Sequence, residues 1–206
     1  MSAMDWLPLD AEGRFLQRPT ALAGLRVFRR HPRGDTRGFL ERLFCHESFA
    51  ALGLTDGIRQ INRTLTRRRG TLRGLHFQHP PHAEGKVVQC LRGRVFDVAV
   101  DLRAGSPTFM QWHAEELSAD NGIGLFIPPG FAHGLQTLED DTELLYLHTA
   151  DYRAEAEGGL SPLEPRLAIG WPLPSEEMSE RDRAHPPLPA NFAGLLLPPH
   201  TKDRPT

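Results

Sequence analysis

The chain has 206 residues, and 24 Lys and Arg against 26 Asp and Glu leave a formal charge of −2. This balance disfavours a polyanion such as nucleic acid as the main partner, and we interpret the arginine run 67–69 as a solvated hairpin tip. The length predicts one domain. Two cysteines, Cys45 and Cys90, cannot form a disulfide framework, so we expect two buried free thiols in a reducing cytoplasm.

No secretion signal or membrane-spanning segment is apparent in the sequence. Residues 1–8 are acidic and lack the basic region and apolar stretch of a leader. The longest uncharged run, 121–138, contains Pro128 and Pro129, which would interrupt a spanning helix. We therefore expect a cytoplasmic protein that does not bind a membrane.

Most predicted elements are short strands. Residues 1–24 have the pattern of a loosely structured lead-in, and one short helix is predicted over 46–52, ended by Gly53 at its C′ position. Alternation of apolar and polar residues is the signal of a half-buried strand. It predicts strands at Gly38–Phe44, Ile58–Thr64, Gly70–Gln78, Lys86–Leu91, Arg94–Leu102, Met110–Leu117, Gly124–Ile127, His133–Thr137 and Glu143–His148.

Arg94–Leu102 carries the clearest strand pattern, with Phe96 and Val98 on one face and Asp97 and Asp101 on the other. About nine such strands, separated by turns, predict an all-β sandwich or barrel of the jelly-roll kind. We expect a single domain over 1–206. It would comprise the lead-in, a barrel core over about 25–150, and a segment over 151–206 that packs on the barrel. Polar residues that face the lumen are candidates for a site.

Ten histidines are candidates for ligands or catalysts. His31, His46, His185 and His200 lie among loop residues, and we expect them to be solvated. The run from His76 to His79 lacks a His-x-His pair followed by Glu at ligand spacing. Two histidines three residues apart on a strand also point to opposite faces. We therefore expect no catalytic metal.

His76 lies on a predicted strand that it shares with several polar residues. Alternation places Leu72, Gly74, His76 and Gln78 on one face. An inward imidazole is either a hydrogen-bonded core residue or a general base. Arg73 falls on the opposite face. If Arg73 and His76 both reach one cavity, the strand must bulge, and Gly74 is the residue that would permit it.

Tyr146 shares a strand face with His148. A buried tyrosine commonly has only a structural role. Together with His76, Lys86 and Asp97, however, it could line one lumen, and that set suits proton transfer next to a carbonyl. The sequence contains no nucleophile elbow, phosphate loop or dinucleotide fingerprint, which removes several classes of enzyme.

Eight segments together resemble the dTDP-4-dehydrorhamnose 3,5-epimerases, nucleotide-sugar epimerases of the cupin superfold. The segments are DTRGFLE (35–41), QINRT (60–64), LRGLHFQ (72–78), GKVVQC (85–90), FDVAVDLRAGSPTF (96–109), IPPGFAHG (127–134), ELLYLHTADY (143–152) and WP (171–172). The resemblance implies an all-β cupin-type jelly-roll barrel (a double-stranded β-helix) with a few short peripheral helices. It also implies catalysis without metal or other cofactor, and a homodimer whose exchanged N-terminal strands help to build the partner's site.

The resemblance implies a role for each matching residue. His76 resembles the base, Asp182 its orienting carboxylate, Tyr146 the acid on the other face, and Lys86 the cation that stabilises the substrate oxygen. The positions that match those holding the nucleotide diphosphate sugar are Arg37, Glu41, Gln60, Asn62, Arg73, Lys86, His133, Glu157 and Arg181, with Tyr152 stacked on the base. Asp97, Gln78 and His148 are expected in the pocket. From the residues alone, Arg37 is equally well read as a surface cation.

The implied chemistry is inversion at C3 and C5 of a dTDP-linked 4-keto-6-deoxyhexose through an enolate. We expect cations such as Lys86 to make Tyr146 more acidic. Three alternatives remain open: inversion of one carbon on a dTDP-, CDP- or GDP-sugar, a sugar-binding cupin module without catalysis, and a metal-dependent cupin enzyme. Asp151 stands where the family has the first of two adjacent tyrosines, and His148 can enter the pocket. The wall that stacks on the base therefore departs from the family pattern in this chain.

Overall fold

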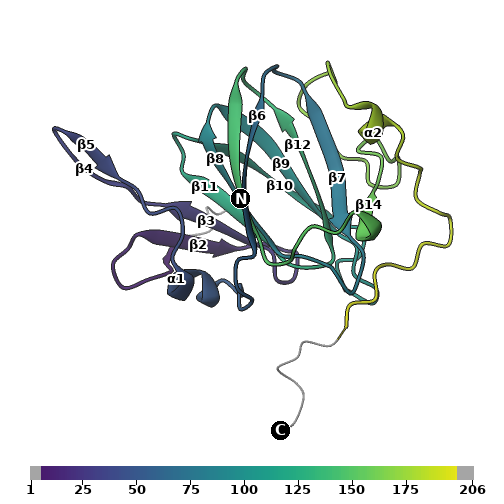
Figure 1. Ribbon diagram of the computed structural model, residues 1–206, viewed down its shortest axis with the longest axis horizontal. Coiled ribbons are helices and arrows are strands. Elements are labelled where there is room, and N and C mark those ends of the chain that lie inside the picture. Colours follow the sequence, from purple (N-terminus) through teal and green to yellow (C-terminus); the bar gives the residue numbers. More distant parts are fainter. Residues whose placement is uncertain (1–5, 199–206) are drawn as a thin grey trace, which may run out of the picture.

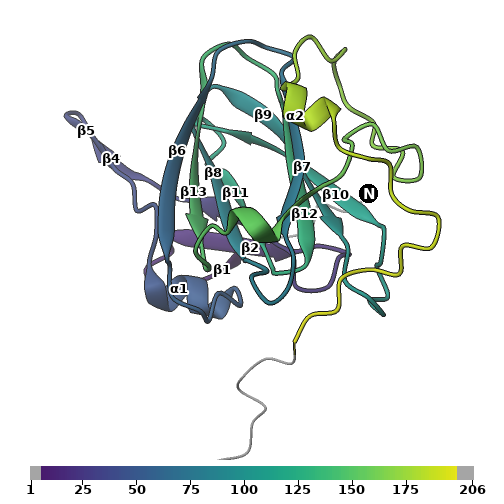
Figure 2. The same ribbon diagram turned by 45° about the vertical axis from the view of Figure 1, so that its right-hand side comes forward.

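The computed structural model describes residues 6–198, which fold as two antiparallel sheets facing each other (Figures 1 and 2). The seven-stranded sheet has the order β1-β2-β3-β11-β8-β13-β6, and the five-stranded sheet β10-β9-β12-β7-β14. This arrangement is the predicted all-β jelly-roll barrel. No helix within residues 6–198 is both long and apolar enough to cross a bilayer.

The strands are β1 Leu7–Pro8, β2 Phe15–Pro19, β3 Arg26–Arg30, β4 Arg33–Asp35, β5 Gly38–Leu40, β6 Gln60–Thr66, β7 Leu72–Gln78, β8 Lys86–Arg92, β9 Arg94–Asp101, β10 Trp112–Ser118, β11 Ile123–Ile127, β12 Phe131–Thr137, β13 Thr142–His148 and β14 Glu157–Gly159. The helices are α1 His46–Ala51, the 3₁₀ turn η1 Ala154–Ala156 and α2 Glu180–Arg183. Eight of the nine predicted strands are confirmed to within two residues at each end. Gly53 follows α1 with φ +104°, as predicted.

The prediction of a loose lead-in is wrong. β1 and β2 lie within residues 1–24, and β2 pairs with β3 along its whole length. Phe15 is fully buried and packs edge-on against Phe28 and Phe49. The pattern failed here because β2 has a single fully buried residue, and its pairing with β3, not alternation, holds it in place.

Three apolar clusters hold the layers together. The first fills the space between the sheets and includes Val88 and Val95. The second lies on the outer face of the five-stranded sheet, where Val98 and Val100 pack against leucines of the C-terminal segment. The third covers the outer face of the seven-stranded sheet, where Phe49 of α1 packs against Phe15 of β2 and Phe28 of β3.

β9 is therefore buried on both faces, although its pattern was typical of a half-buried strand. Phe96, Val98 and Val100 face outward beneath the C-terminal segment, in which Leu160, Leu167 and Leu188 are buried. The carboxylates of Asp97 and Asp101 are fully buried on the other face. Burial of a carboxylate requires a partner, and the side chain that pairs with Asp97, His133, belongs to the candidate site described below. Cys90 is buried as expected, whereas Cys45 is half-buried, and both thiols are free.

The predicted strand over 38–44 ends at Leu40. Leu40 pairs with Arg33, the first residue of β4, so beyond Leu40 the strand has no further partner among residues 6–198. β4 and β5 form a two-stranded hairpin that projects from the body of the molecule (Figure 1). Phe39 and Leu40 are 73% and 67% exposed, which leaves apolar surface on the hairpin open to solvent.

A β-bulge interrupts the pairing of β7 with β12. His76 lies opposite His133 and Arg73 lies opposite Leu135, so two residues of β7 face one residue of β12. The bulge at Gly74, predicted for the case in which Arg73 and His76 share a cavity, is confirmed. The expectation that Leu72 shares the face of His76 is consequently wrong, because the extra residue shifts the alternation.

Glycine is required at the bulge for two reasons. Gly74 has φ +114°, a region that strains any residue with a Cβ. A Cβ at this position would also lie 2.7 Å from the Cα of Gly134 and from the carbonyl oxygen of His133. Both obstacles are backbone atoms, which cannot rotate away.

We predict that Gly74→Ala lowers the free energy of unfolding by at least about 2 kcal/mol. Urea unfolding followed by circular dichroism measures this change. Gly170→Ala is the matched control, because a Cβ there meets no atom within 4 Å and the φ of Gly170 lies outside the strained region. Equal stability of the two variants would show that the bulge does not depend on glycine.

Candidate active site

A cavity of about 220 Å³ opens between the sheets. Its lining residues are Asn62, Thr64, Arg73, His76, Lys86, His133, Gly134, Leu135, Tyr146 and His148. His76 comes from β7 in the five-stranded sheet, and Tyr146 comes from β13 in the seven-stranded sheet. The fold thus brings an imidazole and a phenol from opposite sheets to one cavity.

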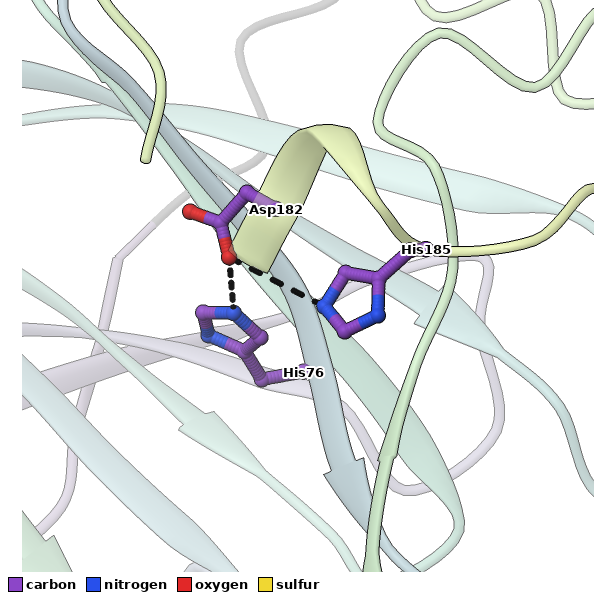
Figure 3. A group of neighbouring side chains, drawn as sticks. All are labelled: His76, Asp182 and His185. Atoms are coloured by element: carbon purple, nitrogen blue, oxygen red, sulfur yellow. Dashed lines mark hydrogen bonds and ion pairs between the residues drawn. The ribbon is translucent and has the colours of Figure 1, made fainter. Parts of the chain in front are cut away.

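Asp182 holds the imidazole of His76 in a defined orientation. Its Oδ1 lies 2.6 Å from Nε2 of His76 (Figure 3). Asp182 belongs to α2, whose N-cap Ser179 accepts a hydrogen bond from the backbone N–H of Asp182, and the N–H of Gly74 donates to its Oδ2. The helix cap and the bulge therefore place the carboxylate over β7.

The pKa of Asp182 is lowered. Burial raises this pKa, but the hydrogen bond and charge of His76, with the N–H of Gly74, outweigh burial. An ionised carboxylate can only accept hydrogen bonds. Nε2 of His76 must therefore carry the proton of the neutral ring, and Nδ1 keeps a lone pair.

His133 is held by a second buried carboxylate. Its Nε2 lies 2.9 Å from Oδ2 of Asp97, and both residues are buried. Asp97 lies behind His133 and does not itself line the cavity. Its Oδ1 is buried without a hydrogen-bond partner among the described residues. On this side of the cavity, the carboxylate of Asp97 therefore lies behind the imidazole of His133.

The environment of Tyr146 makes its phenol less acidic. Burial raises the pKa of Tyr146, and the charge of Asp97 raises it further, whereas Arg73 and a hydrogen bond with Thr64 lower it. The net effect is a raised pKa. The expectation that cations such as Lys86 make Tyr146 more acidic is therefore wrong: the influential cation is Arg73, and burial outweighs it. The phenol keeps its proton throughout the neutral range.

Glu84 binds both Lys86 and His148, which line the cavity. It was not among the residues predicted from the sequence. Its Oε1 lies 3.0 Å from Nζ of Lys86, and its Oε2 lies 2.9 Å from Nδ1 of His148. The His148 ring lies nearly parallel to that of Tyr146, at 24° and 6.0 Å between centroids. Glu84 lies in a loop, where alternation gives no signal, and only its position two residues before Lys86 hinted at a role.

A groove of about 700 Å³ adjoins the cavity. The cavity and the groove share Arg73 and His76. Arg67, Arg68 and Arg181 also line the groove. The run 67–69 is exposed, as predicted, but the expectation of a hairpin tip is wrong, because the run joins β6 and β7 of different sheets. Arg67 and Arg68 face this groove. Its concentration of guanidinium groups suits a phosphorylated ligand.

Four of the predicted binding residues form a chain of contacts between the two sheets. The backbone N–H of Tyr152 donates to Oε1 of Gln60 at 3.0 Å, and its hydroxyl donates to Oε2 of Glu157 at 3.0 Å. Glu157 is ion-paired with Arg181. Gln60 and Glu157 belong to β6 and β14, which are edge strands of the two sheets. Tyr152 thereby links the two edges.

Three predicted site residues lie away from the cavity in this single chain. Arg37 is exposed in the β4–β5 hairpin and pairs with Asp35. Glu41 lies 3.3 Å from Arg30. The expectation that Gln78 lines the pocket is wrong. Its buried side-chain amide donates to the carbonyl oxygens of His82 and Asp151 and accepts from the N–H of Arg153.

The expectation that His185 is solvated is also wrong. Its side chain is only 13% exposed, and its ring lies 5.7 Å from that of His76. Alternation cannot reveal this placement, because α2 and the turn after it bring the residue back onto β14. His31 and His46 are exposed as predicted, and His200 lies outside the described residues.

We predict that Glu84→Gln lowers the free energy of unfolding by about 1–3 kcal/mol at pH 7. Burial raises the pKa of Glu84, but the hydrogen bond of His148 and the charge of Lys86 outweigh burial, so the folded-state pKa is lowered. The ionised carboxylate therefore stabilises the fold above its unfolded pKa of about 4.3, and this contribution fades as the pH falls through the lowered value.

The difference between wild type and Glu84→Gln in urea unfolding should accordingly be large at pH 7 and shrink below about pH 4. Glu155→Gln serves as the control, because Glu155 is exposed and its replacement should have little effect at either pH. A loss that is the same at both pH values would contradict the assigned ion pairs.

Comparison with known proteins identifies the family. The family model described as dTDP-4-dehydrorhamnose 3,5-epimerase matches residues 19–190. A dTDP-4-dehydrorhamnose 3,5-epimerase of Sinorhizobium fredii is 43% identical over 169 residues, which cover 82% of this chain and 87% of the relative.

Solved structures agree with the sequence comparison. The crystal structure of a dTDP-6-deoxy-D-glucose-3,5-epimerase from Legionella pneumophila, in complex with dTDP-4-keto-L-rhamnose, is 39% identical with a TM-score of 0.79, covering 83% of this chain and 91% of that one. A 3′-monoepimerase from Streptomyces bikiniensis, in complex with dTDP-quinovose, is 32% identical with a TM-score of 0.75, covering 82% and 86%. The chain belongs to the dTDP-4-dehydrorhamnose 3,5-epimerase family, whose members are isomerases.

Proposed function

We propose that this protein inverts C3 and C5 of a dTDP-linked 4-keto-6-deoxyhexose by removing and returning a proton at each carbon. The observation that carries the proposal is the pair of His76, held by Asp182 at 2.6 Å, and Tyr146, which line one cavity from opposite sheets. Family membership gives the substrate class.

His76 is the base in the proposed mechanism. A carbonyl at C4 acidifies the hydrogens on C3 and C5, because the electron pair left on carbon delocalises onto the oxygen. Nδ1 of His76 takes the proton, and Asp182 stabilises the imidazolium that forms. Lys86 stabilises the charge that develops on the C4 oxygen, and Glu84 fixes the position of its ammonium group.

Tyr146 is the acid in the proposed mechanism. Its phenol gives a proton to the carbon from the face opposite His76, so the configuration inverts. The raised pKa of Tyr146, which burial causes first and Asp97 second, keeps the phenol protonated before each transfer. Its proton then returns by exchange with solvent.

The proposed binding mode places the sugar in the cavity and the diphosphate in the arginine-lined groove. Arg73 lies at the junction of the two and would contact both parts of the ligand. Tyr152, 54% exposed, provides an aromatic face for the base. A thymine nucleotide is favoured, because the relatives described above are named for dTDP-sugars or hold them.

One alternative within the same chemistry is inversion of a single carbon. The resemblance to a 3′-monoepimerase favours it as the second candidate. In this chain His148, anchored by Glu84, lines the cavity beside Tyr146, so its ring would contact the sugar next to the proposed acid.

We predict that the protein in deuterated water places deuterium at both C3 and C5 of dTDP-4-keto-6-deoxyglucose, with both centres inverted. Nuclear magnetic resonance of the product measures the label at each carbon. Deuterium at one carbon alone would establish the single-carbon alternative. Binding of the substrate without any exchange of hydrogen for deuterium would instead support the alternative of a sugar-binding cupin module without catalysis.

The same experiment separates the base from the acid. His76→Asn should reduce exchange at both carbons by at least about 100-fold. Tyr146→Phe should keep exchange but return the proton to the face it left, so that deuterium enters without inversion. Near-wild-type turnover of both variants would refute the assigned roles.

We also propose that the active form is a homodimer in which the β4–β5 hairpin reaches the partner's site. No residue of the hairpin lines the cavity of its own chain, yet the hairpin presents Phe39 and Leu40 to solvent. β6 is an edge strand that pairs only with β13 among the described strands, and it exposes Ile61 and Leu65. Apolar edges and hairpins of this kind are typically covered by another chain.

Mixing two inactive variants tests the exchange of hairpins. If Arg37 of one chain binds the phosphates in its partner's site, a heterodimer of His76→Asn and Arg37→Glu contains one site with both defects and one with neither. Random association should then restore about one quarter of the wild-type activity. Each variant alone is the control. A mixture as inactive as its components, or a monomer in sedimentation, would contradict the proposal.

A further inference from the structure

Three potential metal ligands meet beside the cavity. Oδ1 of Asp182 lies 2.6 Å from Nε2 of His76 and 3.8 Å from Nε2 of His185 (Figure 3). The ligand atoms of all three residues lie within 4.8 Å of one another. Figure 3 shows both imidazoles turned toward the same carboxylate, one from β7 and one from the turn after α2.

His185 is held in this position with its nitrogen unused. The ring packs directly on Gly159, where a Cβ would overlap it, and Gly159 pairs with His76 across β14 and β7. Nε2 of His185 is buried and has no hydrogen-bond partner among the described residues. A buried polar atom without a partner is costly and calls for an explanation, such as an ion.

We propose that His76, Asp182 and His185 bind Zn²⁺ or a similar transition-metal ion. Two imidazoles and a carboxylate are a common zinc donor set. Bonds of about 2.1 Å in a tetrahedron place ligand atoms about 3.4 Å apart. The observed 2.6 and 3.8 Å lie on either side of this spacing, so shifts of less than about 1 Å would accommodate the ion. The groove, which His76 and Asp182 both line, admits the ion and a water as fourth ligand.

The ion would act as an inhibitor, a consequence that rests on the proposed function. A metal on Nε2 of His76 replaces the proton there. The neutral ring then carries its proton on Nδ1, the nitrogen proposed to abstract the substrate's proton, so no lone pair remains to act as base. Asp182 is simultaneously withdrawn from His76. Turnover is lost, while the arginines of the groove remain free to bind substrate.

The test measures metal binding and activity separately on the full chain after treatment with a chelator. Competition with a zinc-indicator dye gives the affinity. We expect one Zn²⁺ per chain, loss of turnover in proportion to occupancy, and recovery with chelator. Mg²⁺, which prefers oxygen ligands, should have no effect. Co²⁺ in the same site should give the strong visible absorption of tetrahedral coordination, a readout that needs no variant.

His185→Gln removes one ligand and should weaken zinc binding at least about tenfold. His46→Gln is the matched control, because His46 is exposed on α1, and its zinc affinity should equal that of the wild type. For each variant, activity with zinc is divided by activity without it, so that any change in basal turnover cancels.

Zinc affinity unchanged by His185→Gln, or the absence of stoichiometric binding and of the Co²⁺ absorption, would overturn the proposed site. Stoichiometric binding that leaves turnover intact would overturn the inhibition. A chain without epimerase activity refutes the proposed function alone, because the dye competition and the Co²⁺ spectrum still decide whether the metal site exists.

Discussion

The extra residue that β7 carries at Gly74 is the constraint on which the candidate site depends. It turns Arg73 and His76 to one face of a strand on which strict alternation would separate them. It also brings the N–H of Gly74 to the carboxylate that orients His76. The close approach to Gly134 leaves no room for a Cβ, so one glycine governs both the geometry of the strand and the position of the imidazole.

Burying a polar side chain in a barrel costs free energy unless the side chain has a hydrogen-bond partner. The cavity supplies such partners by the same kind of pair three times. Each of its three imidazoles is anchored through one ring nitrogen by a carboxylate. The pairs are His76 with Asp182 at 2.6 Å, His133 with Asp97 at 2.9 Å and His148 with Glu84 at 2.9 Å. The anchoring fixes each ring and leaves its other nitrogen available. Among residues 6–198, His185 has no such bond, which sets it apart from the other three.

The strands of the barrel could be predicted because alternation is visible within a few neighbouring residues. The placement of His76 and Tyr146 in one cavity was predicted from the family motifs that contain them. The sequence could not predict which face of β9 is inside, since the covering leucines follow at 160 and beyond. It placed His185 in solvent because the turn after α2 has no periodicity. It also misjudged the acidity of Tyr146, because nearby cations in a motif say nothing about burial or about Asp97.

The two-sheet architecture itself suits the proposed inversion. Inversion needs a base and an acid on opposite sides of a flat enolate, with water kept away while the carbon is planar. A single sheet would present both groups from one side. Here β7 and β13 belong to facing sheets, and the apolar cluster between them closes the space beneath the cavity. The acid and base can therefore approach the sugar from two walls that the same core holds apart.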